Sequence, residues 1–417
     1  MTKTISVLGL GYIGLPTATI LAAAGHTVRG YDVNRKIIDR LRAGEIHIEE
    51  PGLLAATRQA LASGRLEPVD TLGPADAHIV CVPTPFSEHT KTADLSYVEA
   101  AAKALAPVVR RGDLVILEST VPAGTTANVF APILETSGLD AKRDLHVVHC
   151  PETVLPGNTL HEMASNHRVV GGLTPQATAY ASALYATFVK GHIIETDATT
   201  AEFVKLAENA FRDVNIAFAN EIALVARSLG IDAREAIAIA NLHPRVRIHA
   251  PGPGVGGHCI PVDPWFLVEA APWARVLRAA REVNDAMPSH VANLVAAAVR
   301  DVDRPVVALL GVAYKANVDD IRESPSLAIA RLLGERIAGI EIRAVDPHVP
   351  VERWPTMPLE AALEGADCIV LATDHDAFRR LDPRRAAASM RTRRAVDTRG
   401  FLDRPAWTAE GFGLDVV

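Results

Sequence analysis

Short apolar runs alternate with segments of helical periodicity along the first half of the chain. Residues 4–9 and 27–32 have the composition of buried strands, while residues 12–24 and 35–43 place apolar side chains at helical spacing. Further apolar runs, separated by helical stretches, follow at 79–82, 114–117 and 146–149. Because strands that alternate with helices assemble into parallel sheets, this pattern predicts a doubly wound α/β domain.

The hydrophobic pattern becomes continuously helical from Thr199 to about Leu229. A helix of about 30 residues is about 45 Å long, which exceeds the length of most helices in globular proteins. Such a helix can connect two domains and offer a surface to a second copy of the chain. Residues 274–300 predict another long helix.

A second α/β pattern begins with the apolar run at 304–311. Ser324 followed by Pro325 is typical of a helix start, with the serine as N-cap. Later strands are predicted at 340–343, 368–372 and 395–397. The predicted fold class is therefore α/β, with two Rossmann-like doubly wound domains joined by a long central helix and helical region. We place the domains at 1–196, 197–300 and 301–417.

Composition and charge narrow the function classes. A chain of 417 residues is too long for a single domain with one hydrophobic core. Its net charge of −7 gives no evidence of a basic surface for nucleic acid or an anionic membrane. No apolar run reaches about 18 residues, so we predict no membrane span. The four cysteines are scattered without a C-x-x-C pair, which argues against a zinc cluster or a disulfide framework. We therefore predict a cytoplasmic protein without a metal site.

A glycine fingerprint, Gly9, Gly11 and Gly14, lies between the first predicted strand and helix. The first glycine makes a tight turn, the second lets the backbone approach a pyrophosphate, and the third allows close helix–strand packing. Asp32 ends the second predicted strand, where a carboxylate binds ribose hydroxyls and repels a 2′-phosphate. This arrangement predicts NAD as the cofactor, although Arg35 could weaken the preference over NADP. The predicted cofactor loop also includes Tyr12 and Ile13.

Residues 251–266 are rich in glycine and proline, which predicts a shaped loop. Such a loop can expose backbone N–H groups to a diphosphate. Cys259 lies at its end, close to a predicted helix start, where a thiolate can be stabilised. An isolated cysteine is more often a packing residue, but the loop and the nearby Asp263 favour a nucleophile here. The imidazole of His258 could activate this thiol or simply pack beside the loop.

Three polar side chains share one face of the long predicted helix. Lys205, Asn209 and Arg212 are spaced at i, i+4 and i+7. A solvated polar stripe is the commoner explanation on any helix. The apolar composition of the rest of this helix is equally compatible with the lining of a pocket.

Several spaced motifs together make the sequence similar to the UDP-glucose/GDP-mannose dehydrogenases over nearly its whole length. They are the glycine fingerprint, the Lys205 helix, the Cys259 loop, and the segments at 82–85, 118–126 and 311–325. The resemblance implies an NAD domain, a central helical region that forms a homodimer, and a C-terminal domain that binds a UDP-sugar. It also implies oxidation of the C6 alcohol of that sugar to a carboxylate, with two NAD+ per turnover.

The resemblance also implies roles for individual residues. Cys259 matches the nucleophile that forms a thiohemiacetal and then a thioester, and Lys205 matches the lysine that stabilises oxyanions, with Asn209 as its neighbour. Asp263 and Thr120 match residues that handle protons and position water, and Glu152 matches a glutamate used in thioester hydrolysis. Positions near the cofactor are matched by Pro83, Thr84 and Thr120. Predicted UDP-sugar contacts are Glu152, Lys205, Asn209, Arg212, Arg245 (from a partner subunit), Gly254, Gly256, Gly257, Lys315, Arg322 and Arg399.

The segment 150–157 distinguishes subfamilies. Its sequence Cys-Pro-Glu-Thr-Val-Leu-Pro-Gly resembles that of UDP-N-acetylmannosamine dehydrogenases, whereas UDP-glucose enzymes usually carry a second glutamate where this chain has Pro156. Thr153 departs from the arginine usual in the former group, and Arg247 from its asparagine. We therefore predict UDP-N-acetyl-D-mannosamine as substrate, with UDP-N-acetylglucosamine, UDP-glucose and GDP-mannose as alternatives.

Two alternative functions from other classes of protein stay open. A non-catalytic sugar-nucleotide binding protein would not need the combination of Cys259, Lys205, Asn209, Asp263 and Glu152. A two-electron 3-hydroxyacid dehydrogenase could share the first domain, but it would need neither Cys259 nor the C-terminal domain.

Overall fold

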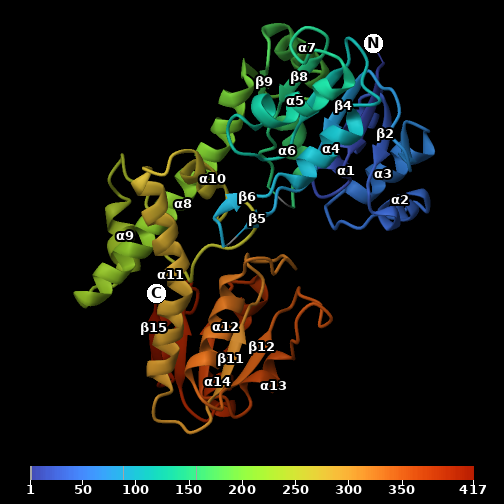
Figure 1. Cartoon of the computed structure of the whole chain (residues 1–417). Helices are drawn as coiled ribbons and strands as arrows, with labels where there is room; N and C mark the ends of the chain where they lie inside the picture. Colours follow the sequence, from blue (N-terminus) through green and yellow to red (C-terminus); the bar gives the residue numbers. More distant parts are fainter. Residues whose placement is uncertain (1, 88, 156) are drawn as a thin grey trace. The chain divides into compact units, whose positions relative to one another are not determined.

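The computed structural model describes residues 2–87, 89–155 and 157–417 (Figure 1). Pro156, which replaces the second glutamate of the UDP-glucose motif, lies outside the described residues. The chain forms two compact units. The first ends at Glu208 and also includes Glu269–Ala271, and the second comprises Asn209–Val268 and Pro272–Val417. The structure does not separate residues 197–300 as a unit of their own, so the three-domain division stays a prediction.

The first unit contains an eight-stranded sheet with the order β10-β9-β8-β7-β4-β1-β2-β3. Its parallel strands are β1 (Thr4–Leu8), β2 (Thr27–Tyr31), β3 (Leu66–Val69), β4 (Ala77–Val80), β7 (Leu114–Leu117) and β8 (His146–His149). The predicted doubly wound order is confirmed, because the chain proceeds outward from β1 in both directions. Three strands were not predicted: β3, β9 (Arg168–Gly172) and β10 (Ile193–Asp197). Both β9 and β10 run antiparallel to β8.

Helices pack on this sheet because their apolar faces complete its two buried layers. The helices are α1 (Gly14–Ala23), α2 (Arg35–Arg42), α3 (Leu53–Ala62), α4 (Ser96–Leu105), α5 (Ala131–Leu134), α6 (Thr159–Ser165) and α7 (Pro175–Tyr185). A small hairpin is formed by β5 (Phe86–Ser87) and β6 (Thr92–Ala93).

The long predicted helix is present as α8 (Ala198–Ser228), whose residues from Asn209 onward belong to the second unit. It is followed by α9 (Ala233–Ala240), α10 (Asp263–Ala270) and α11 (Arg275–Ala298). Arg281 and Asn284 of α11 are buried against Asp213 of α8, with the guanidinium 2.5 Å and the amide 2.8 Å from the Asp213 carboxylate. These polar contacts fix α11 against α8, because a buried carboxylate without partners would be costly.

The second unit also contains a five-stranded parallel sheet with the order β12-β11-β13-β14-β15. The strands are β11 (Val306–Leu310), β12 (Glu341–Val345), β13 (Cys368–Leu371), β14 (Arg394–Asp397) and β15 (Gly413–Val416). The helices are α12 (Pro325–Arg336), α13 (Leu359–Leu363), α14 (Pro383–Ser389) and α15 (Arg404–Ala409). The predicted cap of α12 is confirmed, since the Ser324 hydroxyl accepts the N–H of Ser326.

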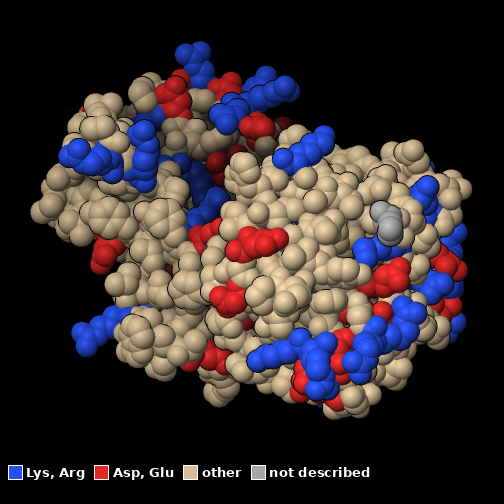
Figure 2. Space-filling view, turned by 90° about the horizontal axis from the view of Figure 1, so that it is seen from above, with Lys and Arg blue, Asp and Glu red and all other residues tan. Residues whose placement is uncertain are grey.

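One face of the molecule carries charged side chains of both signs (Figure 2). On the face that Figure 2 shows, basic and acidic side chains are interspersed among the described residues, without a continuous patch of either sign. Within the described ranges, no helix combines the length and the apolar character that a membrane span requires.

Candidate active site

The glycine fingerprint forms the turn from β1 to α1. Gly9 has φ +84°, and a Cβ added to it would lie 2.5 Å from the carbonyl oxygen of Cys81. A Cβ on Gly14 would lie 1.7 Å from the Gly9 oxygen. At Gly11, by contrast, no described atom lies within 4 Å of an added Cβ. The turn is therefore closed to side chains on its protein side and open to a ligand at its second glycine.

Asp32 holds this turn from the end of β2. One carboxylate oxygen accepts the Leu10 N–H and the other the Asn34 N–H, each at 2.8 Å. Arg35 is exposed and lies 3.7 Å from Asp70. With the open backbone at Gly11 and a carboxylate beside it, these residues fit a dinucleotide whose ribose lacks a 2′-phosphate. Tyr12 is exposed and Ile13 directly precedes α1, so both belong to the same turn.

Two further predicted cofactor positions meet where β4 and β7 end. The Thr84 hydroxyl donates to the Thr120 carbonyl oxygen at 2.6 Å. The Ser119 hydroxyl accepts the Val82 N–H at 3.0 Å and donates to the Val82 oxygen at 2.7 Å. Pro83 lies between these contacts, which join the two strand-end segments.

Glu152 belongs to a buried ionic cluster in the first unit. Arg168 of β9 donates to its carboxylate at 2.9 Å, and the same guanidinium lies 3.8 Å from Glu118. The Tyr185 hydroxyl donates to Glu118 at 2.6 Å. The Thr153 N–H also binds Glu152, at 2.7 Å. All four ionisable side chains of this cluster are less than a tenth exposed, so the glutamate is held away from bulk water.

The four cysteines lie in different environments. Burial raises the pKa of Cys150 to about 12 and that of Cys368 to about 12. Burial and the neighbouring Glu118 raise the pKa of Cys81 well above its usual range. Cys259 is exposed. Of the four, all within the described residues, Cys259 is the exposed one, and Cys81 is partly exposed.

Cys259 lies on the predicted loop, directly before α10. Its carbonyl oxygen accepts the N–H of Asp263 at 2.8 Å and that of Val262 at 3.1 Å. A Cβ on Gly256 would lie 2.5 Å from the Glu323 oxygen, and the Gly257 N–H donates to the Arg322 oxygen at 3.1 Å. The glycines thus let the cysteine loop lie directly on the segment that carries Lys315 and Arg322.

A chain of buried amides fixes the start of this loop. The Gly252 N–H donates to the Asn220 side-chain oxygen at 2.9 Å, and the Asn220 amide donates to Asn284 at 2.8 Å. Arg399 lies on the other side, where a Cβ on Gly252 would be 3.1 Å from its guanidinium. The loop is therefore held by α8, α11 and the segment after β14.

Asn209 and Asp263 are brought together in the second unit. The Asn209 amide donates to the Asp263 carboxylate at 2.6 Å, and Asp263 is buried. Lys205 lies one turn earlier on α8 and is half-buried, while Arg212 is exposed. Lys205 and Cys259 belong to different compact units, so their convergence stays a prediction. Arg245 is exposed in the segment after α9, and its role from a partner subunit stays a prediction.

Sequence reasoning missed the groups that support these residues. Arg168 and Tyr185 carried no motif signal, because neither is near Glu152 in sequence. Asn220, Asn284 and Asp213 lie on helices whose apolar periodicity hides single buried polar side chains. Glu118 was inside a quoted motif, but burial against Arg168 is a tertiary property.

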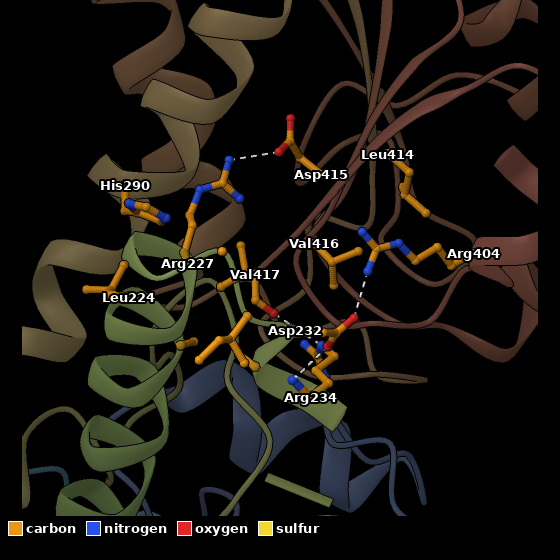
Figure 3. A pocket seen from close by; sticks show the side chains of 14 residues that line it. Leu224, Arg227, Asp232, Arg234, His290, Arg404, Leu414, Asp415, Val416 and Val417 are labelled. Atoms are coloured by element: carbon orange, nitrogen blue, oxygen red, sulfur yellow. Dashed lines mark hydrogen bonds and ion pairs between the residues drawn. The ribbon is translucent and has the colours of Figure 1, made fainter. Parts of the chain in front are cut away.

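A cavity of about 310 Å³ in the second unit contains none of the predicted site residues (Figure 3). Its charged side chains already have partners: Arg227 binds Asp415 at 2.8 Å, and Arg404 binds Asp232 at 2.6 Å. Arg234 donates to backbone oxygens of Val417, Pro251 and Thr398. Across the described parts of the chain, no group of three or more His, Cys, Asp or Glu side chains is placed to hold a metal ion.

Comparison with known proteins gives consistent matches along the chain. Three models of the UDP-glucose/GDP-mannose dehydrogenase family match: the NAD binding domain over residues 3–189, the central domain over 199–286 and the UDP binding domain over 308–404. An NDP-N-acetyl-D-galactosaminuronic acid dehydrogenase from Ralstonia solanacearum is 48% identical, covering 98% of this chain and 97% of the relative. A UDP-N-acetyl-D-mannosamine dehydrogenase from Salmonella typhi is 44% identical, covering 95% of this chain and 98% of the relative.

Solved structures agree with these matches. The structure of a UDP-D-ManNAc dehydrogenase from Pyrococcus horikoshii has a TM-score of 0.93 and 42% sequence identity, with 99% of each chain covered.

Proposed function

This chain belongs to the UDP-glucose/GDP-mannose dehydrogenase family, and from that premise we propose that it oxidises the C6 alcohol of a UDP-N-acetylhexosamine to a carboxylate through a thioester on Cys259. As a member of the family it is an NAD-dependent UDP-sugar dehydrogenase. The Gly11 turn and Asp32 would hold NAD+, which would supply a hydride acceptor for one oxidation and, after NADH is exchanged for a second NAD+, for the other.

The remaining chemistry falls to residues of the chain. The C6 alcohol loses a proton and a hydride to become an aldehyde, and the Cys259 thiolate adds to the carbonyl carbon to form a thiohemiacetal. Loss of a second proton and hydride leaves a thioester. Water then breaks the C–S bond, releasing the carboxylate and regenerating the cysteine. Covalent capture keeps the aldehyde from escaping between the two oxidations.

One observation carries this proposal: Cys259 is the exposed thiol, on a loop whose backbone is fixed at both ends, whereas Cys150 and Cys368 are buried and the raised pKa of the partly buried Cys81 keeps it a thiol. A nucleophile must reach its substrate and keep a defined position. Both requirements are met at this loop.

The other site residues take the roles that the family resemblance implies. We assign Lys205 to the developing oxyanion, and the Asn209–Asp263 pair, joined at 2.6 Å, to proton handling beside the cysteine. Thr120 and Glu152 position the hydrolytic water. UDP contacts come from Lys315, Arg322 and Arg399, with the glycines of the cysteine loop beside them.

For the sugar, we propose UDP-N-acetyl-D-mannosamine first, since several relatives of 40–44% identity and the similar solved structure carry that name. The galacto isomer is the second candidate, because the relative that is 48% identical is named for N-acetyl-D-galactosaminuronic acid. UDP-N-acetylglucosamine, UDP-glucose and GDP-mannose complete the set to be tested. Because a thiol nucleophile needs a reducing environment, we propose a cytoplasmic location.

The experiment is a panel of these nucleotide sugars with NAD+, read by NADH absorbance and by mass spectrometry of the sugar product. We expect two NADH per uronate. Cys259→Ala should abolish uronate formation, and Cys259→Ser should slow it by orders of magnitude, because an alkoxide is harder to form and to expel than a thiolate. Uronate formation by the alanine variant at a near-normal rate would exclude the thioester route.

A further inference from the structure

The two Rossmann-like sheets repeat one hydrogen-bonded turn. In the second unit Gly311 (φ +88°) follows β11, and Asp346 follows β12. Asp346 accepts the N–H of Val312, the residue after the glycine, at 2.8 Å, and the N–H of His348, two residues after the acid, at 2.9 Å. Asp32 accepts the equivalent N–H groups of Leu10 and Asn34 in the first unit. Asp346 is therefore the counterpart of the acid that faces the NAD ribose.

The two turns differ in the residues that follow the next strand of each sheet, β4 in the first unit and β13 in the second. Leu8 pairs with Val80 in the first sheet, and Leu310 pairs with Leu371 in the second, so residues four further on, Thr84 and His375, are equivalent. The Thr84 hydroxyl donates to the Thr120 carbonyl oxygen and not to Asp32. The Nε2 of His375 instead lies 3.0 Å from the Asp346 carboxylate, and both side chains are buried.

The contacts of His375 define its tautomer. Its Nδ1 accepts the N–H of Asn317 at 2.9 Å, so the ring hydrogen must be on Nε2, where it is donated to Asp346. Asp346 also accepts the N–H groups of Ala313 at 3.0 Å and Val349 at 3.1 Å. Five donors fill the two oxygens of this carboxylate, which leaves no site for a ribose diol.

Both ends of one loop are attached to this pair. Asp346 binds the backbone of Val312 and Ala313 at the start of the loop, and His375 binds the backbone of Asn317 at its end. Asn317 has φ +60°, in the left-handed region that asparagine adopts more readily than most residues with a side chain. Its amide and oxygen are further fixed by Asp376, at 2.8 and 3.0 Å. Lys315 lies between the two attachments.

We propose that Asp346 and His375 are positioning residues for the loop 312–317, and that they set the affinity for the UDP moiety by holding Lys315 and not by touching the nucleotide. The inference rests on the proposed function, which assigns UDP to this loop. The sheet of the second unit thus keeps the acid of a dinucleotide site. Because the His375 imidazole binds this acid, Asp346 serves to hold the loop and not to bind a ligand.

The test compares UDP and NAD+ binding by isothermal titration calorimetry in the full-length wild type and three variants. His375→Ala removes both hydrogen bonds of the imidazole, the one to Asp346 and the one from Asn317, whereas His375→Gln keeps a donor toward Asp346 and loses the acceptor for Asn317. His348→Ala is the matched control, because His348 is an exposed imidazole 4.9 Å from the His375 ring that contributes only its backbone to Asp346.

We expect His375→Ala to weaken UDP binding about tenfold or more, the effect of losing one charge-assisted hydrogen bond, and His375→Gln to lie between it and wild type. NAD+ affinity should stay within twofold in both, and KM for the UDP-sugar should rise more than kcat falls. His348→Ala should match wild type.

Unchanged UDP affinity in His375→Ala and His375→Gln would overturn the positioning role. Equal losses of UDP and NAD+ affinity in the glutamine variant would also overturn it, because they indicate general damage. Failure of the wild type to bind UDP would instead overturn the proposed function itself, so the two failures are distinguishable.

Discussion

Glu152 depends on a guanidinium that is itself buried. The guanidinium of Arg168, on β9, donates to this carboxylate and also lies near Glu118. Burial raises the pKa of Glu118, although Arg168 acts in the opposite direction. The cluster therefore pairs two carboxylates with one cation in a place where an unpaired charge is costly.

Replacing Arg168 by Gln should consequently destabilise the first unit by about 3–5 kcal/mol, the usual loss when one partner of a buried ion pair is removed. Differential scanning calorimetry measures this. The control is Lys103→Gln, which removes an exposed lysine 3.1 Å from the partly exposed Glu99 and should cost under about 1 kcal/mol. Similar small losses for both would show that the cluster contributes little to stability.

His149 at the end of β8 makes the stability of the first unit pH-dependent. Burial lowers its pKa to about 3, and neither ring nitrogen has a hydrogen-bond partner among the described residues. The unfolded chain binds a proton near pH 6.5 that the folded chain refuses, so stability falls as pH drops from about 6.5 toward 3.

His149→Phe removes this proton and should flatten that part of the profile. At pH 5 the variant should gain about 1–2 kcal/mol relative to its difference from wild type at pH 8. Urea unfolding at the two pH values measures it. A variant whose stability runs parallel to wild type between these pH values would contradict the assignment.

At the scale of elements, two glycines of the β1–α1 turn are needed for different reasons. A side chain on Gly14 would meet the protein, whereas one on Gly11 would meet only the space for a ligand. Gly11→Ala should therefore leave the melting temperature nearly unchanged while weakening NAD+ binding about tenfold or more. Gly14→Ala, its counterpart, should lower the melting temperature by several degrees. An alanine at position 11 that binds NAD+ normally would show that the cofactor does not approach this backbone.

The chain of buried amides connects two helices, α8 and α11, to the cysteine loop. Asn220→Ala leaves the Gly252 N–H without its acceptor and should destabilise the second unit by about 1–3 kcal/mol. All four tryptophans belong to that unit, so their fluorescence during denaturation reports it directly. Asn215→Ala on the same helix, whose amide binds the Phe211 carbonyl, is the control and should change little.

The element pattern was predictable where periodicity is strong. The strands and helices around Gly9, the long helix and the Ser324 cap follow from local sequence. The antiparallel edge formed by β9 and β10 could not be predicted, because strand direction depends on where the connecting chain packs and not on composition. Site residues that carry motifs were found, whereas Arg168, Asn220 and His375 act through contacts that no local spacing encodes.

For the whole molecule, α8 and α9 expose a row of large apolar side chains that a monomer would leave in water. They include Phe203, Phe211, Phe218, Val225 and Ile239, each about half exposed or more. We propose that a second copy covers this row. Phe211→Glu should convert a dimer to monomers in sedimentation velocity, while Val351→Glu, an exposed apolar position after β12, should not. A wild-type chain that sediments as a monomer would contradict this.

The unequal fates of Asp32 and Asp346 have a practical consequence for redesign. An engineer who wants the enzyme to take a different redox coenzyme should work on the first acid and its neighbours alone, and should keep there an acceptor for the Leu10 and Asn34 N–H groups. The same exchange at the second acid would remove the acceptor of five donors and with it the anchor of an entire loop, so a library that treats the two halves as interchangeable would lose affinity for the nucleotide sugar.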